Sequence, residues 1–563
     1  MNIKNILGGA LCLALFASCG DELDYREFSN YNKDYVFKNF DNTVGFVTNI
    51  YSYLDYDYGM IDGGMQASAC DEAEYAWKSS QVNYFTNGSL SSKNTPSLFG
   101  YYAPIREANY FLAHYPECDF SDYKFNKDYK NQMVRFNRLP YEVRFLRAYY
   151  YALLVKYYGA VPFTTEVLTE AQANALGRTP AQDVMAFVVK ECDEILNHLP
   201  ASYAGLTDDA AAGETGRVTK LAVLALKART LLYAASPLFG AETAERYHQA
   251  ALAAKAVIDS CAAYGVSLGK YAELWGTDNW KAKEVIMARR IGDLNDLERR
   301  NYPMGVENGN SGNCPTQTLV DAYEMRATGK LWNEAGSGYD PQKPYEGRDP
   351  RFAMTIAVNG EKNWPSYNAA ALETYYGGSN GEPKVGATPT GYYLKKLLDG
   401  TVNISSVNGN SKRHSWVAYR LGEFYLNYAE AMFKYSGSAD AVTPDLPMSA
   451  REAVNVIRSR ADVNMPALPT GLSADDFWKK YQNERMVELA FEGHRYNDIR
   501  RWREGASHKD IVEMKITKKA DGTLAYTRHT VSRIWDDKLY FWPISNSEMM
   551  KHTGSGFTQN PGY

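Results

Sequence analysis

Two neighbouring stretches of the chain carry small and aliphatic side chains at the spacing of one helix face, and this pattern constrains the fold most. Positions three and four apart share a helix face, and alanines there let two helices approach closely. We therefore predict a mostly α fold of paired antiparallel helices, loosely similar to tetratricopeptide repeats because no strict 34-residue period is kept. The stripes, in residues 219–235 and 243–261, are Leu221, Leu224, Ala225, Ala228, Leu231 and Leu232, then Tyr247, Ala250, Ala251, Ala254 and Val257.

Further helical stretches lie on both sides of an irregular middle. Helical spacing predicts helices at residues 141–158, 420–435, 449–461 and 474–503. The middle is rich in Gly, Asn, Pro and Trp, and long irregular segments inside an ordered domain usually carry function. We expect one domain over residues 41–563, with helical repeats at about 41–262 and 416–503, a loop-rich ligand-binding insert at about 265–414 and a C-terminal segment at 504–563.

The first residues have the pattern of an export signal. Lys4 precedes an apolar run at residues 6–16, and two small residues then lead into Cys19. The run is shorter than the roughly 20 apolar residues of a membrane-spanning helix. A cysteine directly after small residues is typical of a bacterial lipoprotein, so we predict a signal peptide at residues 1–18, acylation of Cys19, and a tether and N-terminal arm at 19–40. An ordinary cleaved signal with a chance cysteine is the alternative.

Composition excludes some classes of partner and favours others. The 61 basic and 66 acidic residues nearly cancel, and without a run of Lys or Arg we expect no nucleic-acid partner. An odd, scattered set of cysteines predicts apolar fillers rather than a disulfide framework. The 44 tyrosines and 10 tryptophans suit packed helices and also surfaces that grip amphipathic ligands such as sugars. The cysteines that follow Cys19 are Cys70, Cys118, Cys192, Cys261 and Cys314.

The densest charged motif is NERMVELAFEGHRYNDIRRW at residues 483–502. Glu484, Glu488 and Glu492 are four apart, which predicts one shared helix face, and arginines lie three residues from two of them. Two of these carboxyl groups could be the acid and base of a glycosidase. Neighbouring arginines, however, oppose the raised pKa that a general acid needs, so we favour a buried ion-pair lattice.

Other catalytic and metal signals are weaker. Gly377 to Gly381 fits the Gly-x-Ser-x-Gly pattern but follows no buried strand. The eight histidines show no paired metal spacing, and no Cys-x-x-Cys exists. Asp293, Asn295 and Asp296 offer oxygen ligands for Ca²⁺, but the glycine and terminal glutamate of an EF-hand loop are missing. We predict no catalysis and no cofactor, and prefer a surface turn to a calcium site.

A set of motifs spread over nearly the whole chain points to one family. They are the segment at 483–502, RLGEFYLNYAEA at 420–431, FWPI at 541–544, QNPGY at 559–563, EVRFLRAYYY at 142–151 with GAVP at 159–162, and ASACDEA at 67–73. Together they resemble the SusD/RagB family of outer-membrane lipoproteins of Bacteroidetes. The resemblance implies a tetratricopeptide-like scaffold with loop-built glycan sites, lying as a lid on a TonB-dependent SusC-like transporter. The acidic residues after Cys19 resemble the export signal that sends such lipoproteins to the outer leaflet.

The resemblance also implies which residues bind the glycan. Aromatic rings stack on sugar rings, while amide, carboxylate and guanidinium groups bind the hydroxyls. The family's loops after the Asp71-Glu72 motif carry such groups, but where the family often has Trp after a Gly-Ser pair this chain has Leu90. The candidates from these loops are Asp71, Trp77, Asn83 and Tyr84, and the middle loops add Tyr302, Asn313, Trp332, Trp364 and Arg413.

These observations lead to one functional hypothesis and two alternatives. We expect a cell-surface lipoprotein of the outer membrane that captures oligosaccharides by contact alone and delivers them to the transporter. A lipid-anchored glycoside hydrolase is the first alternative. A peptide-binding nutrient-uptake lipoprotein of the RagB type is the second. The identity of the glycan is not fixed by these residues, because stacking tolerates many sugars.

Overall fold

The structure of this chain is a computed structural model that describes residues 33–563, apart from residues 366, 368 and 555. The predicted signal peptide, Cys19 and the tether up to residue 32 lie outside the described residues. Within the described part, no helix has both the length and the apolar character needed to cross a membrane.

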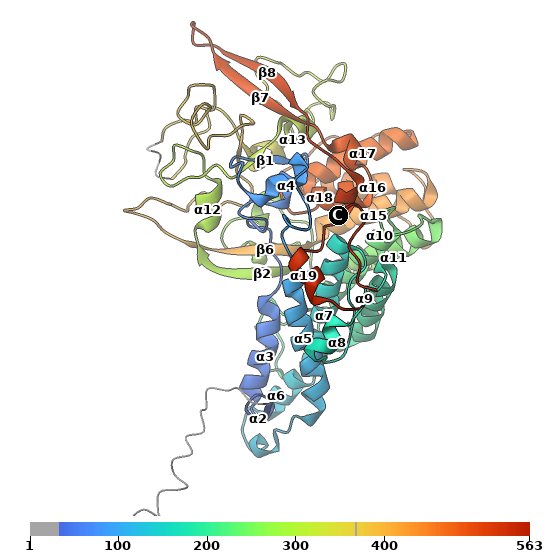
Figure 1. The fold of residues 1–563 in the computed structure, drawn as a ribbon. Helices are drawn as coiled ribbons and strands as arrows, with labels where there is room; N and C mark the ends of the chain where they lie inside the picture. Colours follow the sequence, from blue (N-terminus) through green and yellow to red (C-terminus); the bar gives the residue numbers. More distant parts are fainter. Residues whose placement is uncertain (1–32, 366, 368, 555) are drawn as a thin grey trace, which may run out of the picture.

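A continuous array of helices forms one side of the molecule, and irregular loops with two-stranded ribbons form the other (Figure 1). Each helix of the array packs on the next, and α15 packs on α11 although the whole middle section separates them in the sequence. This confirms the mostly α scaffold. The array comprises α5 (Tyr102–His114), α7 (Leu139–Tyr158), α9 (Ala181–Ile195), α10 (Lys220–Ala235), α11 (Ala244–Ala263), α15 (Leu421–Ser436), α16 (Ala450–Arg458) and α17 (Ala474–Glu488).

The predicted alanine seam lies at the centre of this array. The Thr219 side chain accepts a hydrogen bond from the amide of Ala222 and starts α10, and Thr243 starts α11 in the same way. Ala250 and Ala254 of α11 are buried in the same cluster as Ala429 of α15. Small side chains therefore allow the two helices that flank the middle section to pack closely.

The long helix predicted at residues 474–503 is in fact two helices. α17 ends at Glu488, and α18 spans Arg495–Arg501. Phe491 and Gly493 between them have φ of +61° and +75°, a left-handed backbone that a helix cannot contain. Glu492 therefore lies outside the helix that carries Glu484 and Glu488. The sequence pattern missed this break because charged residues continue at helical spacing through it.

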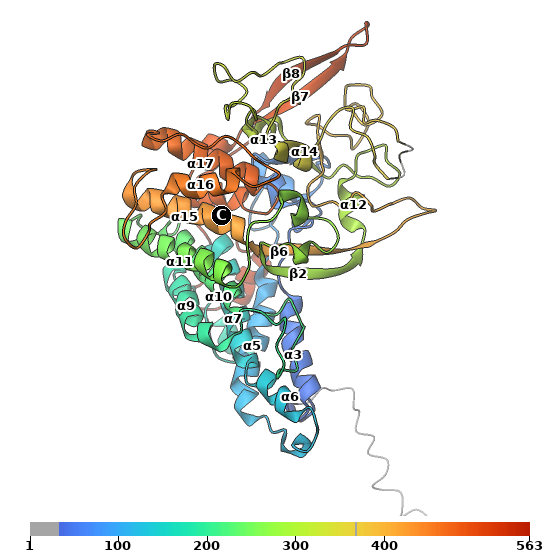
Figure 2. The same ribbon diagram turned by 180° about the vertical axis from the view of Figure 1, so that it is seen from behind.

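The opposite side is made of antiparallel ribbons and loops, which Figure 2 shows from behind. β2 pairs with β6, β1 with β3, β4 with β5, and β7 with β8, the last pair forming a hairpin that projects from the top of Figure 1. The strands are β1 (Ala73–Tyr75), β2 (Val285–Leu294), β3 (Asn313–Pro315), β4 (Ile356–Ala357), β5 (Tyr393–Leu394), β6 (Lys412–Arg420), β7 (Ile511–Lys518) and β8 (Leu524–Val531).

Shorter helices join these parts and close the narrow lower end in Figure 1, where α2, α3, α5 and α6 lie. They are α2 (Lys33–Phe37), α3 (Phe40–Ser52), α4 (Tyr84–Asn87), α6 (Tyr129–Phe136), α8 (Glu170–Asn174), α12 (Asp296–Asn301), α13 (Gln317–Ala322), α14 (Pro350–Thr355) and α19 (Asn546–Lys551).

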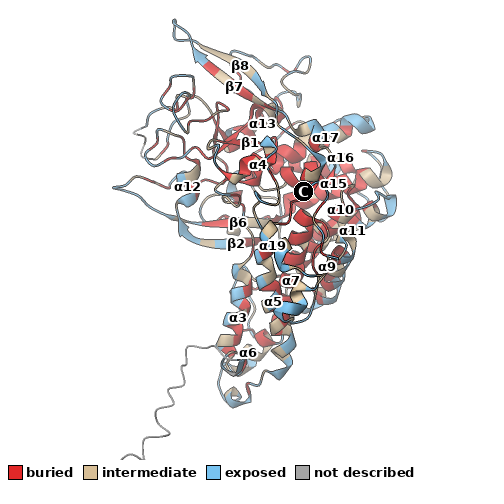
Figure 3. Ribbon diagram, in the orientation of Figure 1, coloured by how far each residue is buried: buried red, intermediate tan, exposed pale blue. Residues whose placement is uncertain are grey.

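Buried residues run through the helical array and continue under the loops (Figure 3). Two hydrophobic clusters fill the array, one among α5, α7, α9 and α10 and one among α11, α15, α16 and α17. A separate cluster, which includes Tyr302, Trp364 and Phe491, lies under the loops. The loop side is thus a packed part of the protein with a core of its own. The five described cysteines are free thiols, as predicted, and all but Cys118 are buried.

Candidate functional site

The nine predicted ligand-binding residues fall into two groups by exposure. Trp77, Tyr84 and Trp332 are half-buried and Arg413 is exposed, so these four can be reached by a ligand. The side chains of the other five lie in the interior: Asp71, Asn83, Tyr302, Asn313 and Trp364. Because these five side chains are buried, we infer that they hold the fold together. Their contacts show how.

Asp71 is an internal ion-pair partner and not a helix cap or an exposed ligand group. Its carboxylate accepts two hydrogen bonds from Arg495 of α18, at 2.9 and 2.7 Å. Burial raises the pKa of Asp71, but the charge and hydrogen bonds of Arg495, with the charges of His508 and Arg533, together outweigh burial and lower that pKa below its usual value. A carboxylate held this way has no free oxygen to offer a sugar.

Three candidates from the middle section hold the loops together. The Asn313 carboxamide accepts from the amide of Met65 and donates to Asn301, both at 2.8 Å. The Tyr302 hydroxyl lies 2.9 Å from the carbonyl of Val402, and Trp364 packs edge-on against the Tyr302 ring at 5.2 Å. These contacts fix the loop that contains residues 302–312.

That loop supports Trp77, one of the accessible aromatic candidates. The indole Nε1 of Trp77 donates to the carbonyl of Asn310 at 2.8 Å. Gly386 packs against the ring so closely that a Cβ there would lie 2.6 Å from Cζ2 of Trp77 and 2.7 Å from the methyl of Met304. We call Trp77 with Met304, Asn310 and Gly386 the Trp77 platform. A ring fixed at its edge and backed by protein is the arrangement that sugar stacking requires.

Polar residues lie close in sequence to the platform residues. Asn83 donates to the carbonyl of Trp77 at 3.0 Å and so fixes the turn that follows Trp77. Lys78 directly follows Trp77, and Lys384 lies two residues before Gly386; both side chains are exposed. Both segments that form the platform therefore also carry an exposed ammonium group.

Two predicted residues lie at other places. Trp332 is covered by the guanidinium of Arg528, 3.6 Å from its ring centre, and neighbours Tyr339. Arg413 lies on β6, opposite Asp293 of β2. No contact in the described part of the chain joins either of them to the Trp77 platform.

Sequence reasoning missed Met304, Asn310 and Gly386, which form the support of the Trp77 ring. Residues 302–314 and 376–386 are rich in Gly and Asn, which predicts irregular backbone there. This composition does not predict which residues contact the Trp77 ring. Close approach of Gly386 to an aromatic ring depends on three-dimensional placement.

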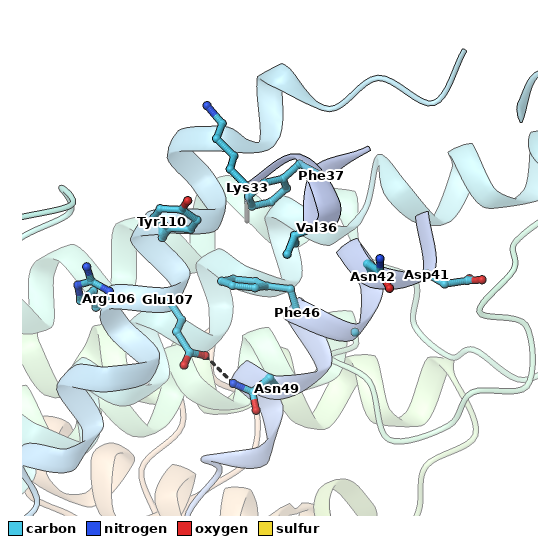
Figure 4. Close-up of a pocket in the computed structure, with 11 residues that line it drawn as sticks. Lys33, Val36, Phe37, Asp41, Asn42, Phe46, Asn49, Arg106, Glu107 and Tyr110 are labelled. Carbon is cyan, nitrogen blue, oxygen red and sulfur yellow. Dashed lines mark hydrogen bonds between the residues drawn. The ribbon is translucent and has the colours of Figure 1, made fainter. Parts of the chain in front are cut away.

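A large groove lies elsewhere, between α2, α3 and α5 (Figure 4). It has a volume of about 740 Å³ and contains the rings of Phe37, Phe46 and Tyr110. Asn49 donates to Glu107 across it at 2.9 Å. None of the nine predicted residues lines this groove. It lies at the end of the fold where the described chain begins, away from the loops (Figure 1).

The glutamates of the 483–502 motif form the buried ion-pair lattice that the sequence favoured. Glu488 accepts from Arg351, Arg420 and Arg460 at 2.8–2.9 Å. Burial raises the pKa of Glu488, but the three guanidinium charges outweigh it and lower the pKa to about 2. The pKa values of Glu484 and Glu492 are also lowered.

The arginines of the motif do not pair with the glutamates three residues away. Arg485 bonds to Asp498 at 2.6 Å, and Arg495 turns away to Asp71. Carboxylates held ionised in this way cannot donate the proton that glycoside cleavage needs from a general acid.

The oxygen-rich turn at residues 293–296 has other uses. Asn295 accepts from Arg299 at 3.2 Å and donates to the carbonyl of Asn410 at 3.0 Å. Among residues 33–563, leaving aside the three undescribed positions, no group of three or more His, Cys, Asp or Glu side chains is arranged to hold a metal ion.

Comparison with known proteins gives one consistent result. The model of the SusD family matches residues 283–563. SusD-like protein P25 of Formosa agariphila is 24% identical over 384 residues, which cover 64% of this chain and 63% of that relative. The chain thus spans less than two thirds of the length of this curated relative.

Solved structures match over nearly the whole chain. A SusD-like protein from Bacteroides fragilis has a TM-score of 0.75 at 25% identity, covering 94% of this chain and 99% of its own. A SusD-like carbohydrate binding protein from the same species has a TM-score of 0.72 at 22% identity, covering 92% of this chain and 99% of its own. By its motifs, its helical array and these matches, the chain belongs to the SusD family.

Proposed function

We propose that this protein is a cell-surface lipoprotein that captures oligosaccharides at the Trp77 platform and delivers them to a SusC-like TonB-dependent transporter. The observation that carries the proposal is the half-buried indole of Trp77, fixed by the carbonyl of Asn310 and backed by Gly386. Aromatic residues supply a large contact area at low entropic cost, and a prefixed ring loses less freedom on binding.

Binding without cleavage agrees with the electrostatics of the acidic groups. The glutamates that sequence spacing could have made catalytic are held ionised by arginines. Solved proteins of the same fold are described as a SusD-like carbohydrate binding protein and as a laminarin binding SusD-like protein. We therefore place the capture of a glycan, and not its hydrolysis, at the loop side.

Membrane attachment and delivery rest on the sequence pattern and the family resemblance. The lipobox-like Cys19 lies 14 residues before Lys33, the first described residue, at the narrow end of the fold. An acyl anchor at Cys19 would hold the protein on the outer membrane from that end. The transporter would then receive the glycan released from the loops.

Affinity electrophoresis against a panel of polysaccharides tests the proposal. We expect retardation by at least one glycan, no release of reducing ends during incubation, and no binding of short peptides in parallel titrations. Release of reducing ends would favour the glycosidase alternative. Binding of peptides with no retardation by any glycan would favour a RagB-type peptide carrier.

A further inference from the structure

A second pocket with ligand-binding chemistry lies away from the Trp77 platform, between the start of α10, the end of α11 and β2. Its volume is about 230 Å³. Its lining includes the apolar side chains of Val285 and Met287 and the aromatic rings of Trp280 and Tyr264. Tyr264 is 51% exposed, so its ring can be reached from solvent. We call this the Trp280 pocket.

Arg290 gives this pocket its charge. The guanidinium of Arg290 lies 3.5 Å from the centre of the Trp280 ring and bonds to the hydroxyl of Thr215. Behind it lies Gly216, whose added Cβ would be 3.4 Å from the guanidinium carbon. Because Gly216 has φ of +102° and no side chain, the guanidinium fits between its backbone and the indole. Arg290 is therefore held in one orientation before any ligand arrives.

The charge of Arg290 has no carboxylate partner in the described part of the protein. The other arginine that lines the pocket, Arg217, is paired with Glu142 at 3.0 Å and Glu214 at 2.7 Å. Asp278, whose charge acts on Arg290, is itself paired with Lys281 at 2.8 Å. Arg413 adds a second positive charge, and together burial and the charge of Arg413 lower the pKa of Arg290.

We propose that the Trp280 pocket binds an anionic sugar residue, with Tyr264 against the sugar ring and Arg290, backed by the Trp280 indole, on a carboxylate or sulfate group. An arginine fixed beside an aromatic ring, with most of its donors unused, is suited to two-point bonding of such groups. The neutral platform at Trp77 has no such fixed guanidinium. The inference rests on the proposed glycan-binding function and narrows the ligand to acidic glycans.

Isothermal titration of the full mature protein with matched probes tests this pocket. The first pair of probes is an oligogalacturonide and its fully methyl-esterified form, and the second is a sulfated galactan oligosaccharide and its desulfated form. We expect at least one acidic probe to bind about tenfold more tightly than its neutral partner, with affinity that falls as salt rises. Which pair shows the difference identifies carboxylate or sulfate as the group bound.

Variants then assign the effect to Arg290. Arg290→Gln should abolish the preference for the acidic probe, whereas Lys283→Gln, which removes an exposed charge of the same sign two residues before β2, should keep it. Thermal unfolding verifies that both variants fold. As a readout without variants, a crystal of the wild-type protein soaked with galacturonate or a sulfated galactose should show the acidic group against Arg290.

Three results would overturn the inference. The acidic and neutral probes could bind equally well, Arg290→Gln could bind the acidic probe like the wild type, or neutral glycans could bind while both acidic probes fail. In each of these cases the proposed function would still stand if the wild type binds a glycan and Trp77→Ala does not. Failure of every glycan to bind would remove both proposals together.

Discussion

Arg495 and Asp71 form a two-point ion pair that joins the first turn of α18 to the segment just before β1. Nε and Nη2 of Arg495 lie 2.9 and 2.7 Å from the two carboxylate oxygens of Asp71, and both side chains are buried. The residues are 424 positions apart. The pair therefore ties the segment that leads into β1 and Trp77 to α18, which lies far along the chain.

Asp71→Asn should destabilise the fold strongly. Removal of one partner leaves the buried charge of Arg495 uncompensated, which costs about 3–5 kcal/mol. Glu346→Gln is the control, because the Glu346 and Lys343 side chains are 70% and 60% exposed and such pairs contribute about 0–1 kcal/mol. Urea unfolding measures both. An Asp71→Asn midpoint equal to that of the wild type would contradict the structural role of this pair.

Glu72, the residue after Asp71, should make the fold less stable as pH rises. Burial and then the charge of Asp71 raise the pKa of Glu72 from 4.5 to about 8, and its Oε2 has no hydrogen-bond partner among the described residues. The folded state thus holds a proton that the unfolded state releases, so this group's contribution falls between pH 4.5 and 8 by up to about 1.4 kcal/mol per pH unit.

The variant Glu72→Gln isolates that contribution. Its free energy of unfolding should decline less steeply than that of the wild type between pH 5 and 8, as measured by urea unfolding at each pH. Parallel pH profiles of the two proteins would show that Glu72 titrates normally in the fold.

Gly386→Ala should weaken glycan binding by moving the Trp77 ring. The new Cβ would lie 2.6 Å from the indole, which must shift or tilt. Gly377→Ala is a matched control, since Gly377 has a similar φ of +85° but nothing within 4 Å of an added Cβ. Both variants carry backbone strain, but only Gly386→Ala should lose affinity, by about tenfold or 1.4 kcal/mol. Equal glycan affinities in the two variants would show that Gly386 does not support the binding site.

Cys19→Ala should release the protein from the outer membrane. Two or more acyl chains anchor a protein stably at about 0.8 kcal/mol per buried CH₂, and the variant has no acceptor for them. Cell fractionation should find the variant in the soluble fraction, with Cys118→Ala retained in the membrane fraction as a control for loss of a thiol. Continued sedimentation of Cys19→Ala with membranes would argue against lipidation.

The helical scaffold was predictable because local patterns determine it. Helices α7, α10, α11 and α15 begin and end within one or two residues of the positions given by apolar spacing and caps. The exception, the break at Phe491 and Gly493, depends on backbone angles that tertiary packing imposes. The buried lattice of glutamate and arginine was also predictable, although its individual partners were not.

The candidate site was harder to predict, because exposure depends on how distant loops pack. Asp71 and Tyr302 have the residue types that bind sugars, yet each is used inside the protein by a partner that the sequence does not reveal. Trp280 and Arg290 are ten residues apart in an irregular stretch without periodicity. Their stacking results from the turn before β2 and the close backbone of Gly216.

The most direct test of the account is isothermal titration of the best glycan of the panel into the wild type, Trp77→Ala and Phe46→Ala. Phe46 is a half-buried aromatic residue in the groove at the opposite end, so its variant controls for loss of a ring. We predict that Trp77→Ala loses about 2 kcal/mol of binding free energy, or roughly 30-fold in affinity, while Phe46→Ala binds like the wild type. Unchanged affinity in Trp77→Ala together with a loss in Phe46→Ala would contradict the account and place the glycan in the groove.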